Sequence, residues 1–553
     1  MSAPPAIRAG LGIPDEISSS LPPMNFTPSR FVTFLLALAF LPGIRAAESA
    51  APALPYLALP GPANPIPPGP VAPTWESVRE NYRTPAWLMD AKFGIFIHWG
   101  VYSVPAHASE WYPHHMYATK SVIDWHREHF GPQDKFGYKD FIPQFTAEHF
   151  DPSAWAALFK RAGARYVVPV AEHHDGFAMY DSALTKWNAK QMGPHRDVIG
   201  ELAAAVRAQG LLFGLSEHRM EHWSFLYPAP GLASDVFDPA FADFYGPPQP
   251  PGPGMQLFEG RIALQSDAFL EEWLRRNQEL VDKYHPSLVY FDNGINSRAL
   301  DPIKLRFAAY YFNRAHEWGQ EVTLATKRDA YLAGSIRDFE RGRTEDIRPQ
   351  FWQCDTTVSH NSWGYVDGLV LRTAGEMVRE LVDVVSKNGA YLLNIAPRAD
   401  GTIPDDQQLR LLEIGDWLHV NGEAIYGSRP WIRYGEGPTP QASPTEGRGI
   451  IDGMLAVYTA QDVRFTTQPA PGGGTGYTLY ATLLAWPADG KVTITSLAPG
   501  PGAPGGEITG VALLGNPKPV TFMRDAAGLH ITLPAWRPSD FANVLKITGL
   551  KQP

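Results

Sequence analysis

The sequence is poor in several features that would assign a protein to a class at once. It holds one cysteine, Cys354, in 553 residues, which excludes an internal disulfide and any metal site built from several thiolates. Its 47 Lys and Arg are outnumbered by 57 Asp and Glu, and a net charge of −10 argues against nucleic-acid binding. No segment reaches the ~18 uninterrupted apolar residues of a membrane span. With 44% hydrophobic residues, the chain is long enough to fold into at least two globular domains.

The N-terminal region has the order of features that is typical of an export signal. Arg30 precedes an apolar stretch at residues 31–41, which is followed by small residues up to Ala46. Eleven residues are too few to cross a bilayer, and the alternative for this stretch is a short buried helix. We expect a signal-peptide region over residues 1–47, cleaved after Ala46, with Met24 as an alternative start. The mature protein is then exported, either to a periplasm or to the medium.

Prolines and the spacing of apolar runs divide the rest of the chain. Residues 48–76 contain nine prolines and little charge, which predicts an extended linker. Over residues 77–435, short apolar runs alternate with amphipathic stretches, which indicates a catalytic β/α barrel. From residue 436 to residue 553, short strand-like runs are separated by Gly- and Pro-rich loops. That pattern of short runs and loops predicts a C-terminal antiparallel β-sandwich.

The predicted fold class is therefore α/β, a (β/α)8-like barrel followed by a β-sandwich. Because residues 75–434 contain no GxGxxG motif, a closed barrel is favoured over a dinucleotide-binding sheet. The expected barrel strands are residues 93–98, 166–171, 211–216, 288–292, 322–325 and 391–395, with helices at 153–162, 198–208, 269–284 and 374–386. The expected sandwich strands are residues 454–458, 477–484, 491–496, 508–514 and 529–533.

Polar residues gather where the first four expected barrel strands end. These ends are His98, the pair His173 and His174, His218, and Asp292. Twelve of the 17 histidines fall between residues 98 and 222, which a scattered structural role does not explain. Because barrel enzymes carry their chemistry at the C-terminal ends of the strands, this cluster predicts an active site.

Two kinds of active site fit this cluster poorly. His173 and His174 are adjacent, so in an extended segment they point to opposite faces and do not suit one metal ion. The sequence has no HExxH motif, and no GxSxG elbow for a serine hydrolase. The histidines are better suited to hydrogen bonds with hydroxyl groups.

Asp292 is the candidate nucleophile. It directly follows the apolar strand at residues 288–291, although Asn293 and Gly294 also suit a structural turn at this point. A glycosidase needs a second carboxyl group with a raised pKa as the acid/base. The charged run at residues 337–348 offers four candidates, which are Asp338, Glu340, Glu345 and Asp346, although such a run is also typical of a solvated loop.

A set of motifs across the central region matches one enzyme family. They lie at residues 92–105 (KFGIFIHWGVYSVP), 109–112, 145–152, 172–177 (EHHDGF), 187–188, 196–197, 291–292, 362–365, 386–389, 394–397, 400–401 and 421–427. With these motifs, which span about residues 75 to 435, the chain resembles an α-L-fucosidase of glycoside hydrolase family 29. The resemblance implies a barrel that departs from a regular (β/α)8, a β-sandwich behind it, and retention of the anomeric configuration.

The resemblance also implies roles for individual residues. Asp292 corresponds to the nucleophile. The residues implied to hold the fucose are His98, Glu110, Trp111, His173 and His174 at the hydroxyls, Phe96 beside the ring, Tyr290 two residues before the nucleophile, and Trp363 against the C5 methyl group. Lys327 or Arg328 corresponds to an arginine near the sugar. His218 belongs to a segment, residues 216–218, that stands where tyrosines are common in the family.

The acid/base is expected to be Glu340, with Asp338 and Glu345 as alternatives, because the family varies in this stretch. The expected activity is exo-acting, retaining hydrolysis of terminal α-L-fucosyl linkages in oligosaccharides or glycoconjugates. It requires no metal and no organic cofactor. The alternative is a carbohydrate-binding barrel with impaired catalysis, which would keep the aromatic pocket and lose a carboxylate.

Overall fold

The computed structural model describes residues 59, 61–246, 248–250, 265–439, 457–470 and 476–551. The expected signal-peptide region lies outside these residues, as do residues 48–58 and 60 of the expected linker and most of the expected strand at 454–458. Across the described ranges, no helix is both long and apolar enough to cross a membrane.

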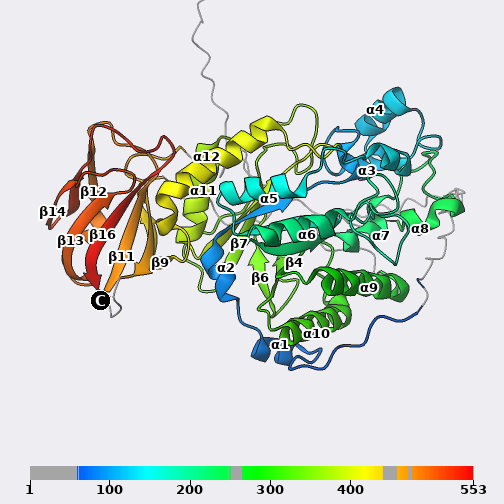
Figure 1. Cartoon of the computed structure of the whole chain (residues 1–553), viewed down its shortest axis with the longest axis horizontal. Coiled ribbons are helices and arrows are strands. Elements are labelled where there is room, and N and C mark those ends of the chain that lie inside the picture. The colour runs from blue at the N-terminus through cyan, green and yellow to red at the C-terminus, as the bar shows by residue number, and fades with distance from the viewer. Residues whose placement is uncertain are drawn as a thin grey trace, which may run out of the picture. The chain divides into compact units, whose positions relative to one another are not determined.

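Eight parallel strands form a closed barrel, which confirms the predicted fold class (Figure 1). Each strand pairs with the next in sequence, and β8 closes the ring by pairing with β1. The strands are β1 (Phe93–Ile97), β2 (Tyr166–Glu172), β3 (Leu212–Glu217), β4 (Leu288–Phe291), β5 (Thr323–Lys327), β6 (Ser335–Asp338), β7 (Trp352–Thr357) and β8 (Gly389–Ile395).

The α-helices of the described residues lie mostly in the connections between these strands. They are α1 (Trp75–Asn81), α2 (Ala86–Ala91), α3 (Tyr112–Ala118), α4 (Lys120–Phe130), α5 (Pro152–Arg161), α6 (Val198–Ala208), α7 (His222–Phe225), α8 (Ala242–Tyr245), α9 (Asp267–Tyr284), α10 (Asp301–Trp318), α11 (Ala374–Ser386) and α12 (Asp405–Asn421). Short 3-10 turns are η1 (Val101–Ser103), η2 (Tyr138–Gln144), η3 (Arg219–Glu221), η4 (Pro239–Phe241), η6 (Arg298–Leu300), η7 (Gly422–Ala424) and η8 (Thr495–Leu497). The helices expected at 198–208 and 374–386 have the predicted bounds.

Two barrel strands, β6 and β7, were not predicted. Their sequences are short and polar, yet β7 is buried along its whole length because it pairs with β6 and β8. The connections on either side of β6, residues 328–334 and 339–351, contain no helix. The ring therefore departs from a regular (β/α)8 pattern on this side.

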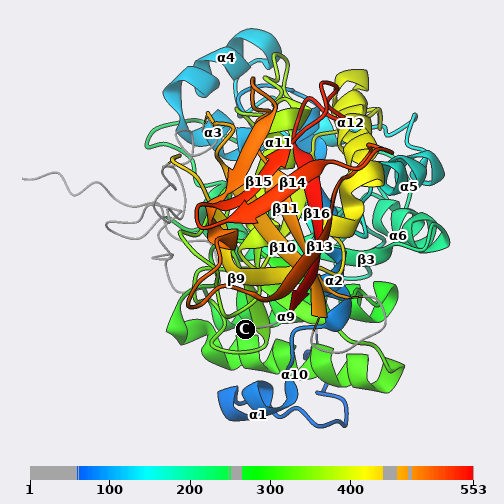
Figure 2. The ribbon, with the colours of Figure 1, turned by 90° about the vertical axis from the view of Figure 1, so that its left-hand side faces the viewer.

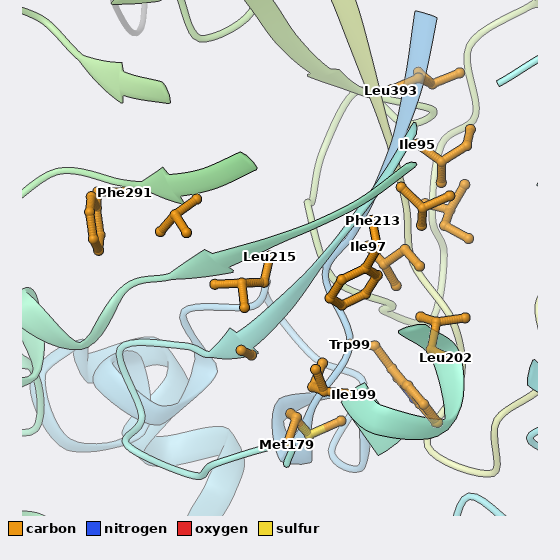
Figure 3. Packing of buried hydrophobic residues seen from close by; sticks show 14 of the residues in the cluster. Ile95, Ile97, Trp99, Met179, Ile199, Leu202, Phe213, Leu215, Phe291 and Leu393 are labelled. Carbon is orange, nitrogen blue, oxygen red and sulfur yellow. The ribbon is translucent and has the colours of Figure 1, made fainter. Parts of the chain in front are cut away.

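Alternation along the strands separates two apolar layers. Ile95 and Ile97 of β1 face outward and pack with Phe213 of β3, in the layer that also holds Ile199 and Leu202 of α6 (Figure 3). A separate cluster fills the barrel, and its members include Phe96, Val168, Leu288, Tyr290, Ala325, Ile336 and Leu392. Because strand side chains alternate between faces, these inward residues fix which residues face the barrel axis at the strand ends.

The C-terminal region folds into two antiparallel sheets (Figure 2). The five-stranded sheet has the order β13-β16-β11-β10-β9 and the three-stranded sheet the order β12-β15-β14. The strands are β9 (Arg429–Glu436), β10 (Val463–Pro469), β11 (Gly476–Leu483), β12 (Lys491–Ile494), β13 (Gly505–Leu513), β14 (Thr521–Asp525), β15 (Gly528–Thr532) and β16 (Asn543–Lys551). Four of them, β9, β10, β14 and β16, were not predicted.

Buried polar contacts join these strands to the barrel. Asp383 of α11 pairs with Lys387 at 2.8 Å and with Arg464 of β10 at 2.6 Å, and all three side chains are buried. Trp417 of α12 donates its indole N–H to the backbone oxygen of Ala542 at 2.9 Å. The second region thus packs against helices of the barrel.

Candidate active site

A cavity of about 750 Å³ opens where the barrel strands end. All ten residues predicted to act or to bind substrate line it: Phe96, His98, Glu110, Trp111, His173, His174, Tyr290, Asp292, Glu340 and Trp363. Its wall also includes Ser109, His114, His115, His218, Asn293, Lys327, Arg341, Asp355, His360, Asn361 and Ser362.

Asp292 reaches this cavity because of the alternation of β4. Leu288 and Tyr290 face the barrel interior, so the next residue of that phase, Asp292, points into the pocket. Its Oδ2 lies 3.5 Å from Nε2 of His174 and 3.3 Å from Nδ1 of His218. Burial alone would raise the pKa of Asp292, but these two imidazoles and the Lys327 charge hold it well below its usual range. The carboxyl group is therefore ionised at neutral pH.

His174 is buried between two carboxyl groups. Its Nδ1 lies 3.5 Å from Oε2 of Glu221, a residue that sequence reasoning missed. Burial opposes the charged imidazolium, but Glu221 and Asp292 outweigh it and raise the pKa of His174 to about 9. Burial raises the pKa of Glu221 to about 8, against the opposing effect of His174. At neutral pH a proton on His174 therefore faces Asp292.

Glu340 lies just beyond β6, in one of the connections without a helix. Its Oε2 is 3.2 Å from Nζ of Lys327, and Lys327 also contacts Oδ2 of Asp355 at 2.8 Å and Oδ2 of Asp338 at 3.4 Å. Burial raises the pKa of Glu340, assisted by the charges of Asp355 and Asp292 and opposed by Lys327. This carboxyl group is therefore easier to protonate than Asp292.

The two alternatives to Glu340 lie elsewhere. Asp338 is buried and accepts a hydrogen bond from Nε2 of Gln353 at 2.8 Å, and Glu345 is exposed. Although the structure describes both residues, neither lines the cavity. Of the two candidates for the cation near the sugar, Lys327 lines the cavity and Arg328 does not.

Hydrogen bonds orient the predicted hydroxyl-binding groups. Nδ1 of His98 lies 2.8 Å from Oδ1 of Asn394, which leaves Nε2 of His98 toward the pocket. Oε2 of Glu110 accepts hydrogen bonds from the backbone N–H of Trp363 at 2.9 Å and from the hydroxyl of Ser362 at 3.2 Å. The loop that carries Trp363 is thereby fixed against Glu110.

Aromatic rings form the apolar part of the wall. The ring centroid of Phe96 lies 5.1 Å from that of Tyr290 and 6.2 Å from that of Trp363. Trp111 lies 5.5 Å from the ring of His174. A pocket with ring faces on one side and imidazole and carboxyl groups on the other suits a sugar, which has both C–H and O–H surfaces.

A buried cluster of four charges supports the β3 end of the site. Glu172 contacts Arg219 at 2.7 Å and Arg276 of α9 at 3.1 Å, and Glu272 contacts both arginines at 2.8 Å. Each charge has two partners of opposite sign, which offsets the cost of burying it. The cluster fixes Arg219, the residue next to His218.

Two sets of described residues have metal-ligand spacing. One consists of His98, His173 and His218, and the other of His174, His218 and Asp292. Sequence reasoning considered only the adjacent pair His173 and His174. The alternation of β3, in which Phe213 and Leu215 face outward, places His218 on the pocket side.

The Glu221–His174 pair predicts a pH dependence of stability. His174 retains its proton in the folded chain at pH values where it loses it in the unfolded chain, so stability falls as pH rises from 6.5 toward 9. An imidazole whose pKa rises from 6.5 to about 9 accounts for on the order of 3 kcal/mol across that interval. Glu221→Gln should flatten this dependence.

Urea unfolding of the wild-type and variant chains at several pH values measures the effect. Glu317→Gln, at a glutamate whose side chain is 58% exposed, is the matched control and should keep the wild-type slope. Identical slopes in all three chains would show that Glu221 does not support the proton on His174.

Comparison with known proteins agrees with this geometry. The alpha-L-fucosidase family model matches residues 64–423, and the model of the alpha-L-fucosidase C-terminal domain matches residues 458–548. Tissue alpha-L-fucosidase of Rattus norvegicus is 32% identical over 497 residues, covering 86% of this chain and 92% of the relative. The human tissue enzyme is 30% identical over 506 residues, covering 88% and 93%.

Solved structures of alpha-fucosidases are also similar to this chain. The crystal structure of Thermotoga maritima alpha-fucosidase in complex with fucose is similar with a TM-score of 0.66 and 29% sequence identity, covering 86% of this chain and 100% of that one. The first family model alone covers more than half of the sequence. The chain therefore belongs to the alpha-L-fucosidase family of glycoside hydrolases, family 29.

Proposed function

We propose that this protein is a retaining, exo-acting α-L-fucosidase that hydrolyses terminal α-L-fucosyl linkages of oligosaccharides or glycoconjugates. Asp292 is the nucleophile and Glu340 the acid/base. The observation that carries the proposal is that two carboxyl groups share one cavity but have opposite pKa shifts, with Asp292 lowered and Glu340 raised. Unequal environments of this kind assign one carboxyl group to attack and the other to proton transfer.

The reaction proceeds in two displacements. Asp292 attacks the anomeric carbon while Glu340 donates its proton to the departing oxygen, which gives a fucosyl-enzyme and a free aglycone. Glu340, now ionised, removes a proton from water, which attacks the same carbon and releases fucose and Asp292. Lys327, 3.2 Å from Glu340, stabilises the ionised form between the two steps. A retaining enzyme of this type holds its carboxyl groups ~5–5.5 Å apart.

The remaining wall residues bind the sugar in this scheme. His98, His173, His174, Glu110 and Trp111 line the cavity and offer hydrogen-bonding groups for ring hydroxyls. Bonds to groups that gain charge in the transition state contribute to rate rather than only to affinity. Phe96, Tyr290 and Trp363 provide ring faces for the C–H surface and the C5 methyl group of fucose.

Replacement of the nucleophile is the first test. Asp292→Gly should fold normally but lose turnover of an aryl α-L-fucoside by about ten thousand-fold or more. Added azide should enter the vacated space and restore part of the rate, with β-fucosyl azide as the product. Rate assays and product analysis measure both effects. Asp525→Gly, on β14 in the C-terminal region, is the control that should keep full activity. Wild-type rates in Asp292→Gly would refute the assignment.

The acid/base has a more selective test. A very acidic phenol leaves without protonation, whereas a natural sugar leaving group needs a proton. Glu340→Ala should therefore slow the hydrolysis of natural oligosaccharides far more, by about 100-fold or more, than that of the activated aryl fucoside. It should also flatten the basic limb of the pH–rate profile, since that limb reports loss of the proton from the acid.

Two neighbouring variants serve as controls for Glu340. Glu345→Ala, at an exposed position, should leave both substrates unaffected, and Asp338→Asn should not discriminate between leaving groups. Equal losses on both substrates in Glu340→Ala would mean that Glu340 only binds substrate or supports the fold. A chain that binds fucose but turns over neither substrate would instead be a carbohydrate-binding barrel.

We also propose that the protein is exported. The support is the order of charge, apolar stretch and small residues before Glu48. Relatives of this chain include enzymes named plasma alpha-L-fucosidase in Rattus norvegicus and Homo sapiens. Mass spectrometry of the protein purified from its native host should find a mature N-terminus near Ala47. An intact N-terminus on protein recovered from the cytoplasm would contradict the proposal.

A further inference from the structure

We propose that His98, His173 and His218 form a binding site for one divalent transition-metal ion of the Zn²⁺ type, and that an ion bound there excludes the fucosyl group from the pocket. Binding of the ion stands on the geometry of the three histidines alone. Its inhibitory consequence rests on the proposed fucosidase function.

The three imidazoles come from the ends of consecutive strands and face one another. The ring centroid of His98 lies 5.7 Å from that of His173 and 5.5 Å from that of His218, and the centroids of His173 and His218 are 5.0 Å apart. One ring nitrogen of each histidine lies within 4.8 Å of one nitrogen of each of the other two. Zinc binds imidazole nitrogen at about 2.0–2.1 Å, which puts two nitrogens of a tetrahedral site about 3.3 Å apart. The distances between the nitrogens must therefore shorten by up to about 1.5 Å for all three to bind one ion.

The other nitrogen of two of these rings is already held. Nδ1 of His98 donates to Oδ1 of Asn394 at 2.8 Å, and Nε2 of His218 lies 2.6 Å from the hydroxyl of Ser216. Metal-ligating histidines are usually oriented in this way by a hydrogen bond from the nitrogen that does not bind the metal. Nε2 of His98 then presents its lone pair to the pocket, as does Nδ1 of His218 in the tautomer whose Nε2–H donates to the Ser216 hydroxyl.

His173 has a spare nitrogen in the same place. Its Nδ1 is fully buried and makes no hydrogen bond to any residue that the structure describes. An unsatisfied buried nitrogen costs free energy, and a metal ion or a ligand hydroxyl removes that cost. All three residues are at least 95% buried, although they line the cavity.

Geometry favours this set over the second one. In the second set both ring nitrogens of His174 already face carboxyl groups, with Nδ1 at 3.5 Å from Oε2 of Glu221 and Nε2 at 3.5 Å from Oδ2 of Asp292. An ion at Nδ1 of His218 would replace the proton shared with Oδ2 of Asp292, 3.3 Å away, and would place a carboxylate beside the cation.

The same atoms are the ones the sugar needs. His98 and His173 are the groups proposed to bind fucose hydroxyls, and Asp292 is the proposed nucleophile. An ion that occupies the histidine nitrogens and attracts the carboxylate would leave neither the histidines free to bind hydroxyl groups nor Asp292 free to attack the sugar.

Calorimetric titration of the full chain with Zn²⁺ tests binding without using activity. The expected result is one ion per chain for the wild type and affinity at least about tenfold weaker in His218→Tyr, since loss of even an outer partner of a metal ligand costs that much. Co²⁺ should give the visible absorption of a tetrahedral site in the wild type and not in the variant. His530→Gln, at a partly exposed histidine of β15, is the matched control and should bind as the wild type does.

A second measurement addresses inhibition. Zn²⁺ should raise the KM of an aryl α-L-fucoside without changing kcat, a chelator should reverse the effect, and His218→Tyr should resist it. If neither chain has fucosidase activity, the proposed function fails while the titration still decides the metal site. If His218→Tyr melts at a much lower temperature than the wild type, His98→Gln takes its place. The proposal would be overturned if the wild type and a folded His218→Tyr or His98→Gln variant bound zinc with equal affinity. It would also be overturned if His530→Gln lost as much zinc affinity as those variants.

Discussion

The site depends on one geometric constraint, the alternation of side chains along strands that close into a ring. Each strand sends every second side chain toward the barrel axis, and the last inward residue decides what the pocket contains. Below the pocket these residues are apolar, as with Phe96, Tyr290 and Ala325. Two positions further along, the same phase delivers His98, Asp292 and Lys327. An apolar barrel core is therefore capped by polar groups without any change in strand geometry.

Closure of the ring also gives the two carboxyl groups different surroundings. Asp292 leaves β4 beside the histidines of β2 and β3, whose contacts favour its ionised form. Glu340 follows β6 on the opposite side of Lys327, where Asp355 is also near. Lys327 also interacts with the charges of Asp355 and Asp338. Its charge therefore does not fully offset the rise in the pKa of Glu340 that burial causes. Strand order thus produces the separation of pKa values that acid/base and nucleophilic roles require.

Histidine is the residue type that makes this pocket adaptable. The same imidazoles can donate to hydroxyl groups, balance a carboxylate, or bind a metal ion, and burial and neighbouring groups decide which. His174 is held protonated by Glu221 and Asp292, whereas burial keeps His98, His173 and His218 neutral. The proposed metal site therefore depends on the third ring, that of His218, which directly follows β3.

The sequence by itself determined the strands whose own residues are continuously apolar, the position of Asp292 at the end of one of them, and the histidine cluster. Local composition decides these features. It could not determine β6 and β7, because these short polar segments become strands only by pairing with β5 and β8. Nor could it choose among Asp338, Glu340 and Glu345. That choice depends on the chain reversal after β6, where Arg341 has φ 46° and its N–H bonds to the backbone oxygen of Asp355, which leaves Glu340 facing the cavity.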